Sequence, residues 1–288
     1  MRVAICYFAY KRSDKVKITL NALLKCRRIN EVDIVIFQDN FNGEVDCMQV
    51  EITYNTIMEI INKSTHPNIR LIQWKEHVGS EISLIKGTEY LLKKNDCAIR
   101  IEEDIEVRED FLEYMLLALE RYKEYDNIFA ICSFNPAFVT NKDIFIASPF
   151  RVWGCGFYAE KFFNINWDKN EMYNQLGKKD YKKLFELFPY SKNLCKDNLV
   201  GLSWDYVVED RLIMYHCYVN DLKCVYPNCS YVRNIGFDGS GVHSGYNTKD
   251  NLNFYKKIKL NFDDYYLSDS DNIELINATI KSYHLEME

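Results

Sequence analysis

Short apolar runs alternate with longer periodic stretches along the first hundred residues of the chain. Four runs are almost continuously apolar, which predicts buried strands at residues 3–9, 32–37, 69–72 and 97–101. Between these runs, apolar residues recur every three or four positions, which predicts three helices; Ser13 and Asp14 are suited to cap the first of them. The resulting order of strands and helices predicts a parallel, right-handed sheet that helices cover.

The later part of the chain has a more mixed pattern. Residues 111–122 have the apolar spacing of a helix, and residues 128–134 form a fifth apolar run. The aromatic stretch at 150–158 contains spaced glycines, which suits a bulged strand and a ligand-binding loop equally well. Beyond a weakly patterned region, the sequence predicts a helix at 203–218 and short strands at 223–226 and 231–234.

A row of acids follows the fourth apolar run, in the stretch DCAIRIEEDIEVREDF at residues 96–111. Glu102, Glu103 and Asp104 come directly after a predicted strand, which places them at the carboxyl edge of the sheet, where open α/β folds bind ligands. Adjacent carboxylates repel one another unless a cation or hydrogen-bond donors neutralise them. Hard oxygen ligands suit Mg²⁺ or Mn²⁺, although an acidic turn with solvated charges gives the same pattern.

The first apolar run ends without a glycine-rich phosphate motif. Neither GxGxxG nor GxxxxGK[ST] follows it, so a dinucleotide-binding fold or a P-loop is not expected. The turn instead contains Tyr10, Lys11 and Arg12, an aromatic and two basic residues, where a base and a phosphate could lie.

Composition narrows the class of protein further. The net charge of −6 argues against a general binder of nucleic acid or of anionic membranes, because both need a basic surface. The 10 cysteines include no CxxC pair, which is typical of reduced, buried thiols. No apolar run approaches the roughly 18 residues of a membrane span. We therefore expect a cytoplasmic protein with no transmembrane segment and no signal peptide.

Six stretches, in this order, resemble the GT-A glycosyltransferases. More closely, they are similar to the family of the alpha-mannosyl-glycoprotein N-acetylglucosaminyltransferases and its bacterial or viral relatives. The resemblance covers roughly residues 2–262 and is carried by the stretches AICYFAYKR, VIFQDNFNGE, RIEEDIEVREDFLEYM, VWGCGFY, WDYVVEDR and NIGFDGSGVHSG.

The resemblance implies an α/β, GT-A-like (Rossmann-like) fold, with a mostly parallel sheet flanked by helices and a mixed C-terminal part. One domain would cover residues 1–288, with a nucleotide-sugar-binding half (1–135), an acceptor and catalytic half (136–262) and a C-terminal extension (263–288). The implied enzyme is a hexosyl- or N-acetylhexosaminyl-transferase that uses Mn²⁺ or Mg²⁺. It would move a sugar from a UDP-linked donor to a glycan, lipid-linked or protein acceptor, with inversion at the anomeric carbon.

The resemblance also implies roles for single residues on the donor side. Asp104 matches the metal-coordinating acid, and Glu103 matches the acid near the ribose or a metal-bound water. Asp39 matches the acid that recognises the uracil, and Arg12 matches a basic residue at the base. Lys86, on the third predicted helix, is a less direct match to a residue of the nucleotide-sugar pocket.

On the acceptor side, Asp205 matches the general base and His243 matches a metal ligand or a diphosphate contact. The sequence departs from the family here, because Tyr206 follows Asp205 where a second acid is usual, so the base could instead be Glu209 or Asp210. The middle acid of the metal motif is also Glu103 rather than aspartate.

Each of these residues has a simpler interpretation. Arg12 is equally consistent with an exposed cation at a helix start, and Asp39 with an acid that accepts hydrogen bonds from turn amides. Asp205 could only cap a helix, and His243 could be an ordinary polar loop residue. Two other functions fit the same predicted fold: a nucleotidyltransferase acting on a sugar phosphate, and a non-catalytic sugar-binding protein.

Overall fold

The structure is a computed structural model that describes all residues except 137, 172–208, 239–253, 255–256 and 285–288. Its central feature is an eight-stranded sheet with the strand order β3-β2-β1-β4-β8-β6-β9-β7. Six of the eight strands run in the same direction, and only β8 and β7 are reversed. The predicted α/β class with a mostly parallel sheet is therefore confirmed.

The parallel half of the sheet comes from the first hundred residues, as the apolar runs predict. Its strands are β1 (Val3–Ala9), β2 (Asp33–Gln38), β3 (Ile69–Gln73) and β4 (Cys97–Glu102). The intervening helices are α1 (Ser13–Leu24), α2 (Glu44–Lys63) and α3 (Ser80–Leu92), with a short 3-10 turn, η1 (Ile29–Glu31), before β2. The cap predicted for the first helix is wrong, because Arg12 holds the cap position without a side-chain hydrogen bond.

The second half of the sheet is mixed. It contains β6 (Ile128–Cys132), β7 (Ile144–Ala147), β8 (Cys155–Tyr158) and β9 (Lys223–Pro227). β8 lies antiparallel between β4 and β6 and so joins the two halves. The aromatic stretch at 150–158 thus ends in a strand, and Gly154, just before it, has a φ of 62°, a left-handed conformation that favours glycine.

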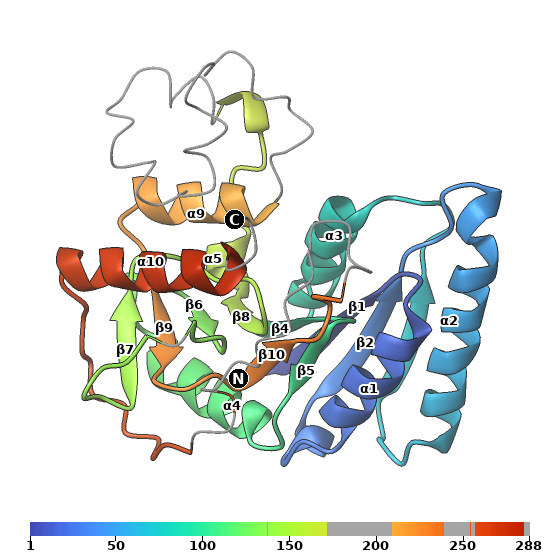
Figure 1. Ribbon diagram of the computed structural model, residues 1–288, viewed down its shortest axis with the longest axis horizontal. Coiled ribbons are helices and arrows are strands. Elements are labelled where there is room, and N and C mark those ends of the chain that lie inside the picture. The colour runs from blue at the N-terminus through green and yellow to red at the C-terminus, as the bar shows by residue number, and fades with distance from the viewer. Residues whose placement is uncertain (137, 172–208, 239–253, 255–256, 285–288) are drawn as a thin grey trace.

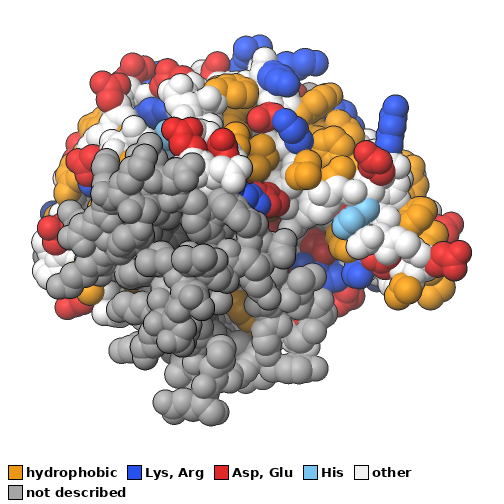
Figure 2. Space-filling model, turned by 90° about the horizontal axis from the view of Figure 1, so that it is seen from above, with side chains coloured by type: hydrophobic (Ala, Val, Ile, Leu, Met, Phe, Trp, Pro, Cys, Tyr) orange, Lys and Arg blue, Asp and Glu red, His pale blue; other side chains and the backbone are white. Residues whose placement is uncertain are grey.

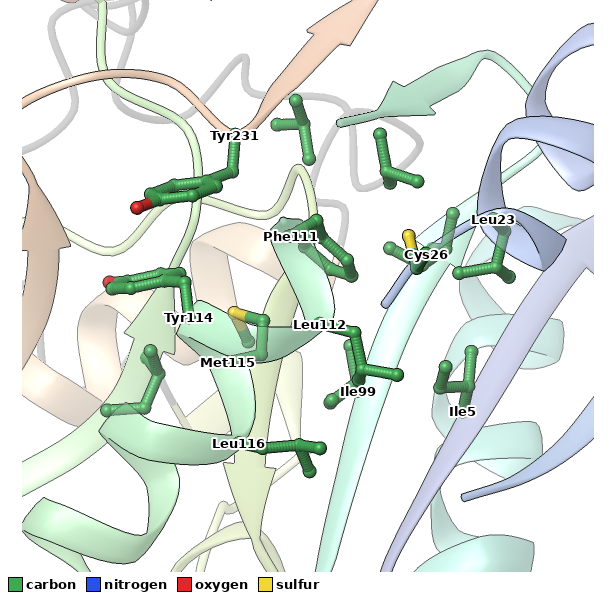
Figure 3. Packing of buried hydrophobic residues seen from close by; sticks show 14 of the residues in the cluster. Ile5, Leu23, Cys26, Ile99, Phe111, Leu112, Tyr114, Met115, Leu116 and Tyr231 are labelled. Atoms are coloured by element: carbon green, nitrogen blue, oxygen red, sulfur yellow. The ribbon is translucent and has the colours of Figure 1, made fainter. Parts of the chain in front are cut away.

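Helices cover both faces of the sheet (Figure 1). One apolar cluster joins the sheet to α1, α2 and α4 (Phe111–Tyr122), and a second joins its other face to α3, α5 (Ala159–Phe162), α9 (Glu209–Val219) and α10 (Asp269–His284). Figure 3 shows the first cluster, in which Phe111, Leu112 and Met115 of α4 lie beside Ile99 of β4. All three α4 side chains are fully buried, as expected for an apolar face at helical spacing.

A second, two-stranded sheet lies beside the acid row. β5 (Ile105–Val107) pairs antiparallel with β10 (Val232–Asn234). The sequence pattern predicts a strand at 231–234 but no strand at 105–107. β9 and β10, which are neighbours in the sequence, belong to different sheets.

The described cysteines confirm the expectation of reduced thiols. All nine are free, and eight of them are buried. Within the described part of the chain, no helix is both long enough and apolar enough to cross a membrane.

Candidate active site

The acid row and the first turn meet because β1 and β4 are neighbours. The two strands are parallel, with Phe8 opposite Glu102, so both chains leave the sheet at the same edge. Residues 10–12 therefore lie against residues 103–104, although about 90 positions separate them in the sequence.

Arg12 connects the two turns through its guanidinium group. Its Nε donates a hydrogen bond of 2.6 Å to Glu103 Oε1, and its Nη2 donates one of 3.0 Å to Asp104 Oδ2. Burial alone would lower the pKa of Arg12, but the two carboxylates outweigh it and raise the pKa above its ordinary value. The side chain is only 20% exposed, so this is not the free helix-start cation of the simpler interpretation.

Both carboxylate oxygens of Glu103 accept hydrogen bonds from the protein itself. Its second oxygen, Oε2, accepts a hydrogen bond of 2.7 Å from the backbone amide of Tyr10, and its backbone carbonyl accepts one of 2.9 Å from Thr19. Burial raises the pKa of Glu103, while Arg12 and the Tyr10 amide act against this. Glu103 thus fixes the shape of the first turn, and the longer side chain at this position reaches across to β1.

Asp104 is more available than Glu103. Its side chain is 15% exposed, and only Oδ2 accepts a hydrogen bond, the one from Arg12, among the described residues. Its backbone carbonyl accepts a hydrogen bond of 2.8 Å from Ile235, just after β10. The carboxyl group is thereby held at the end of the sheet with one oxygen, Oδ1, free to bind a ligand.

This arrangement fits a divalent cation that arrives with a phosphate ligand. Among the described residues, no group of three or more His, Cys, Asp or Glu side chains could hold a metal ion alone. Mg²⁺ commonly binds proteins through one or two carboxylates, while phosphates and waters complete its shell. Asp104 can supply that carboxylate, and Mn²⁺ accepts the same oxygen ligands.

Asp39 lies at the carboxyl end of β2 and holds the loop before α3. Oδ1 accepts hydrogen bonds from the amides of Asn40 (2.9 Å) and Val78 (3.0 Å), and Oδ2 accepts one from Gly79 (2.9 Å). His77 Nδ1 lies 3.0 Å from Oδ2. Three backbone amides thus donate to the two oxygens, so the geometry agrees with the simpler interpretation of an acid that binds turn amides.

Two aromatic residues that the motif comparison did not single out lie beside Asp39. The rings of Tyr10 and His77 are 5.3 Å apart, and His77 Nδ1 is also 3.0 Å from the carbonyl oxygen of Asn40. The Tyr10 hydroxyl donates a hydrogen bond to Asp46 at the start of α2. The sequence shows Tyr10 as an aromatic residue in a turn. For His77 the one signal in the sequence is the nearby Gly79, which indicates a tight loop; its φ in the structure is 81°.

Lys86 does not contact the cluster of Arg12, Glu103 and Asp104. Its side chain is 60% exposed, and its ammonium group lies 3.3 Å from Glu89 on the same helix. It forms no hydrogen bond or ion pair with Asp39, Glu103 or Asp104.

The structure describes some of the predicted acceptor-side residues and not others. Asp205 and His243 lie outside the described residues, as does the first part of the helix predicted at 203–218. Glu209 and Asp210, the alternative bases, begin the described helix α9.

Glu209 forms a buried ion pair with Arg100, a residue of β4. Arg100 Nη2 lies 2.9 Å from Glu209 Oε1, at an angle that is not that of a hydrogen bond, and the side chains are 1% and 6% exposed. Burial raises the pKa of Glu209 to about 7, although Arg100 acts to lower it. Burial also raises the pKa of Glu102 to about 8, and Asp104 adds to this effect.

Asp210 differs from its neighbour because one of its carboxylate oxygens has no hydrogen-bond donor. Its Oδ1 is enclosed by protein and accepts no hydrogen bond. Burial raises the pKa of Asp210, and Arg211 and Arg100 only partly oppose this. An enclosed carboxylate oxygen without a donor is uncommon in proteins and is a feature that calls for a functional explanation.

Figure 2 shows the molecule from above the view of Figure 1. Acidic and basic side chains are interspersed there, and no extended patch of a single charge is formed by the described residues.

Comparisons with known proteins give weak likenesses to glycosyltransferases. No protein-family model matches the sequence, and no curated protein matches it. The mannosyltransferase PcManGT from Pyrobaculum calidifontis, solved with GDP-Man and Mn²⁺, is 13% identical, with a TM-score of 0.42 over 61% of this chain and 46% of that one.

Two structures of TarS from S. aureus are similar at the same level. TarS 1-349 is 11% identical, with a TM-score of 0.47 over 81% of this chain and 60% of that one. Its complex with UDP-GlcNAc is 13% identical, with a TM-score of 0.35 over 46% of this chain and 33% of that one. The chain thus spans less than two thirds of each of these proteins. None is named as a member of the N-acetylglucosaminyltransferase family that the sequence resembles, so that family stays a prediction.

Proposed function

We propose that the protein is a metal-dependent glycosyltransferase that moves a sugar from a nucleotide-sugar donor, UDP-linked, to a glycan, lipid-linked or protein acceptor. The observation that carries the proposal is the meeting of Arg12, Glu103 and Asp104 at the carboxyl ends of β1 and β4. The end of β2, with Asp39, lies next to it in the same sheet. A nucleotide diphosphate needs a bound metal ion or basic side chains for its phosphates and an aromatic residue for its base. This edge of the sheet offers Asp104 as a metal ligand, Arg12 beside it and the ring of Tyr10.

The chemistry of sugar transfer makes use of such a site. The bond between the anomeric carbon and the diphosphate breaks, and the leaving diphosphate gains negative charge. A bound Mn²⁺ or Mg²⁺ ion would supply Lewis-acid stabilisation of that charge. Asp104 would hold the metal through Oδ1, and Arg12 would lie close enough to contribute a second positive charge at the diphosphate rather than at the base.

The acceptor hydroxyl must lose its proton to a carboxylate as its oxygen bonds to the anomeric carbon. The motif comparison favours Asp205 as this base. Of the two described alternatives, Glu209 is engaged by Arg100, whereas Asp210 has an oxygen without a partner. Asp210 is therefore the stronger alternative to Asp205. A single displacement by either base inverts the anomeric carbon.

The remaining assignments follow the motif comparison. His243 would contribute a metal or diphosphate contact, and Lys86 would have to reach the donor from an exposed position on α3. The transferred group is a hexosyl or N-acetylhexosaminyl unit, and the site of action is the cytoplasm.

A donor screen tests the proposal. UDP-, GDP- and CMP-linked sugars would be incubated with the protein and Mn²⁺, and the release of the nucleotide measured with water or simple glycosides as acceptors. We expect release from a UDP-sugar, with a loss of about 10²- to 10³-fold in Asp104→Asn, the usual cost of removing a group that stabilises developing charge. Glu120→Gln is a matched control, because Glu120 pairs with Lys123 at the exposed end of α4. No release from any donor by the wild-type protein would contradict the proposal.

A further inference from the structure

We propose that Gly236 is a positioning residue for Asp104. The lack of a side chain at this position lets the backbone after β10 lie directly against the Asp104 carboxyl group and fix its orientation. The inference rests on the proposed function, because it gives this contact a role in the metal-dependent binding of the nucleotide.

The first observation is the way the two segments are joined. β10 pairs with β5, which begins one residue after Asp104, and the register places Asn234 opposite Ile105. The amide of Ile235 then donates a hydrogen bond of 2.8 Å to the carbonyl oxygen of Asp104. The chain at 234–236 therefore follows Asp104 closely, although about 130 positions separate them in the sequence.

The second observation is the space at Gly236. A Cβ atom there would lie 2.5 Å from Asp104 Oδ2 and 3.0 Å from Asp104 Cβ. Both distances are well below a normal carbon contact. Gly236 does not have the left-handed backbone that favours glycine, so close approach alone is what excludes a side chain.

The affected oxygen is the one that accepts the hydrogen bond from Arg12. Any group that displaced Oδ2 would move the carboxylate away from Arg12 and turn Oδ1 as well. A side chain at residue 236 would therefore disturb both the ion pair and the candidate metal ligand.

The backbone at 236 has little freedom to move aside. On one side, Tyr231 stacks on Tyr114 of α4 with ring centroids 4.6 Å apart, and Figure 3 shows the two rings face to face. On the other side, the Phe237 ring lies 5.7 Å from that of Trp153, and Asp238 forms an ion pair with Lys15 of α1. The Gly236 amide also donates a hydrogen bond of 2.6 Å to Asn234 Oδ1.

The expected consequence is specific to metal binding. Because the segment is held at both ends, an added methyl group is accommodated by rotation of the Asp104 side chain. Functional groups must usually be held within about 0.5 Å of their working positions, so such a rotation weakens the metal-bound state. The rings of Tyr10 and His77, where the base would lie, do not belong to this segment, so binding of UDP without metal should be less affected than Mn²⁺-dependent binding.

The test is a titration of UDP into the protein, with and without Mn²⁺, for wild type and Gly236→Ala. We expect the affinity for UDP in the presence of Mn²⁺ to fall about tenfold or more, a loss of the size that small misplacements cause. The affinity for UDP without metal should fall by less, because the rings of Tyr10 and His77 are not moved and only the contact of Asp104 with Arg12 is disturbed.

Gly156→Ala is the matched control. A Cβ atom at Gly156 would lie 2.9 Å from Met115 Cε and 3.3 Å from Leu119 Cδ2. Both neighbours are apolar core side chains, whereas the neighbour of Gly236 is a carboxylate. This variant should lower the melting temperature without changing the effect of Mn²⁺ on UDP binding.

If Gly236→Ala does not fold, Asn234→Ala serves instead. It removes the acceptor of the Gly236 amide and should weaken Mn²⁺-dependent binding a few-fold, the effect of one lost hydrogen bond.

The outcomes separate the two proposals. A wild-type protein that shows no Mn²⁺-dependent binding of UDP contradicts the proposed function. A wild-type protein that shows it, together with a Gly236→Ala variant of equal affinity, overturns only the role of Gly236. An equal loss of UDP affinity with and without Mn²⁺ also overturns that role, because it reports general damage to the site.

Discussion

The carboxyl ends of β1 and β4 and the start of α9 both gather charged residues, but they stabilise them differently. At the first region, every oxygen of Glu103 has a donor, and Arg12 joins it to Asp104 close to solvent. At the second, Arg100 and Glu209 form an ion pair in the interior, and Asp210 has an oxygen without a donor. The first arrangement is organised to bind a charged ligand, whereas in the second burial raises the pKa of the carboxyl groups.

The largest expected effect concerns the second region. Arg100→Met removes the partner of Glu209 and leaves its carboxyl group buried. We expect the free energy of unfolding to fall by about 3–5 kcal/mol, the cost of breaking a buried ion pair from one side. Urea unfolding would measure it.

The double variant Arg100→Met/Glu209→Gln sharpens this prediction. It removes both charges, so it should recover a large part of the lost stability. A double variant no more stable than Arg100→Met would show that the ion pair is not the reason for the loss.

The next effect concerns the first region. Arg12→Met removes two charge-assisted hydrogen bonds and leaves Glu103 and Asp104 without their cation. We expect the affinity for UDP in the presence of Mn²⁺ to fall about 10- to 100-fold, the equivalent of about 1.5–3 kcal/mol for a hydrogen bond to a charged group. Arg121→Met, at a surface ion pair with Asp264, is the control. Unchanged affinity in Arg12→Met would mean that Arg12 serves only the fold.

A pH experiment separates the regions in another way. The pKa of Glu209 is about 7 in the folded protein, above its ordinary value of 4.5. The folded state therefore holds this proton more tightly than the unfolded state, so the stability that it contributes is present at low pH and is lost as pH rises from about 4.5 to 7.

Glu209→Gln should remove this contribution. The fall in the free energy of unfolding between these pH values should be smaller in the variant than in wild type, as measured by urea unfolding at several pH values. Glu113→Gln, at an exposed pair with Arg27, is the control for a carboxyl group on the surface. An identical profile for wild type and Glu209→Gln would contradict the buried state assigned to this carboxyl group.

The smallest expected effect is that of His77→Ala. This ring lies beside Tyr10 and is 29% exposed, so it is placed to contact a nucleotide base without being essential to the fold. We expect the affinity for UDP to fall about two- to fivefold, with and without Mn²⁺, because one aromatic or hydrogen-bond contact is worth about 0.5–1.5 kcal/mol. A loss seen only with Mn²⁺ would place His77 at the metal instead.

The sequence pattern predicted the parallel half of the fold well for a physical reason. β1, β2 and β4 are buried on both faces and therefore appear as continuous apolar runs, and α4 has an apolar face at regular spacing. β5 is three residues long and β7 is four, which is too short for a period to be visible, whereas the equally short β10 was predicted as a strand at 231–234. The pairing of β5 with β10 depends on contacts across the whole chain, and no local pattern reports it.

The candidate site was predictable in place but not in detail. An acid row after a strand indicates the edge of the sheet, yet the contact between Arg12 and Asp104 depends on β1 and β4 being neighbours. The donors around Asp39 come mainly from the loop at 77–79, so its role in holding that loop could not be inferred from residue types alone. Arg100 lies within an apolar run, where a single basic residue gives no sign of the buried partner more than a hundred positions away.

The central claim is that Asp104 and its neighbours form a metal-dependent nucleotide site. The most direct test is isothermal titration of the wild-type protein and Asp104→Asn with UDP, each with and without Mn²⁺. We predict that Mn²⁺ strengthens UDP binding to the wild-type protein at least tenfold, about 1.4 kcal/mol, and has no such effect on Asp104→Asn. UDP binding that is absent in the wild-type protein, or that responds to Mn²⁺ equally in both proteins, would contradict the claim.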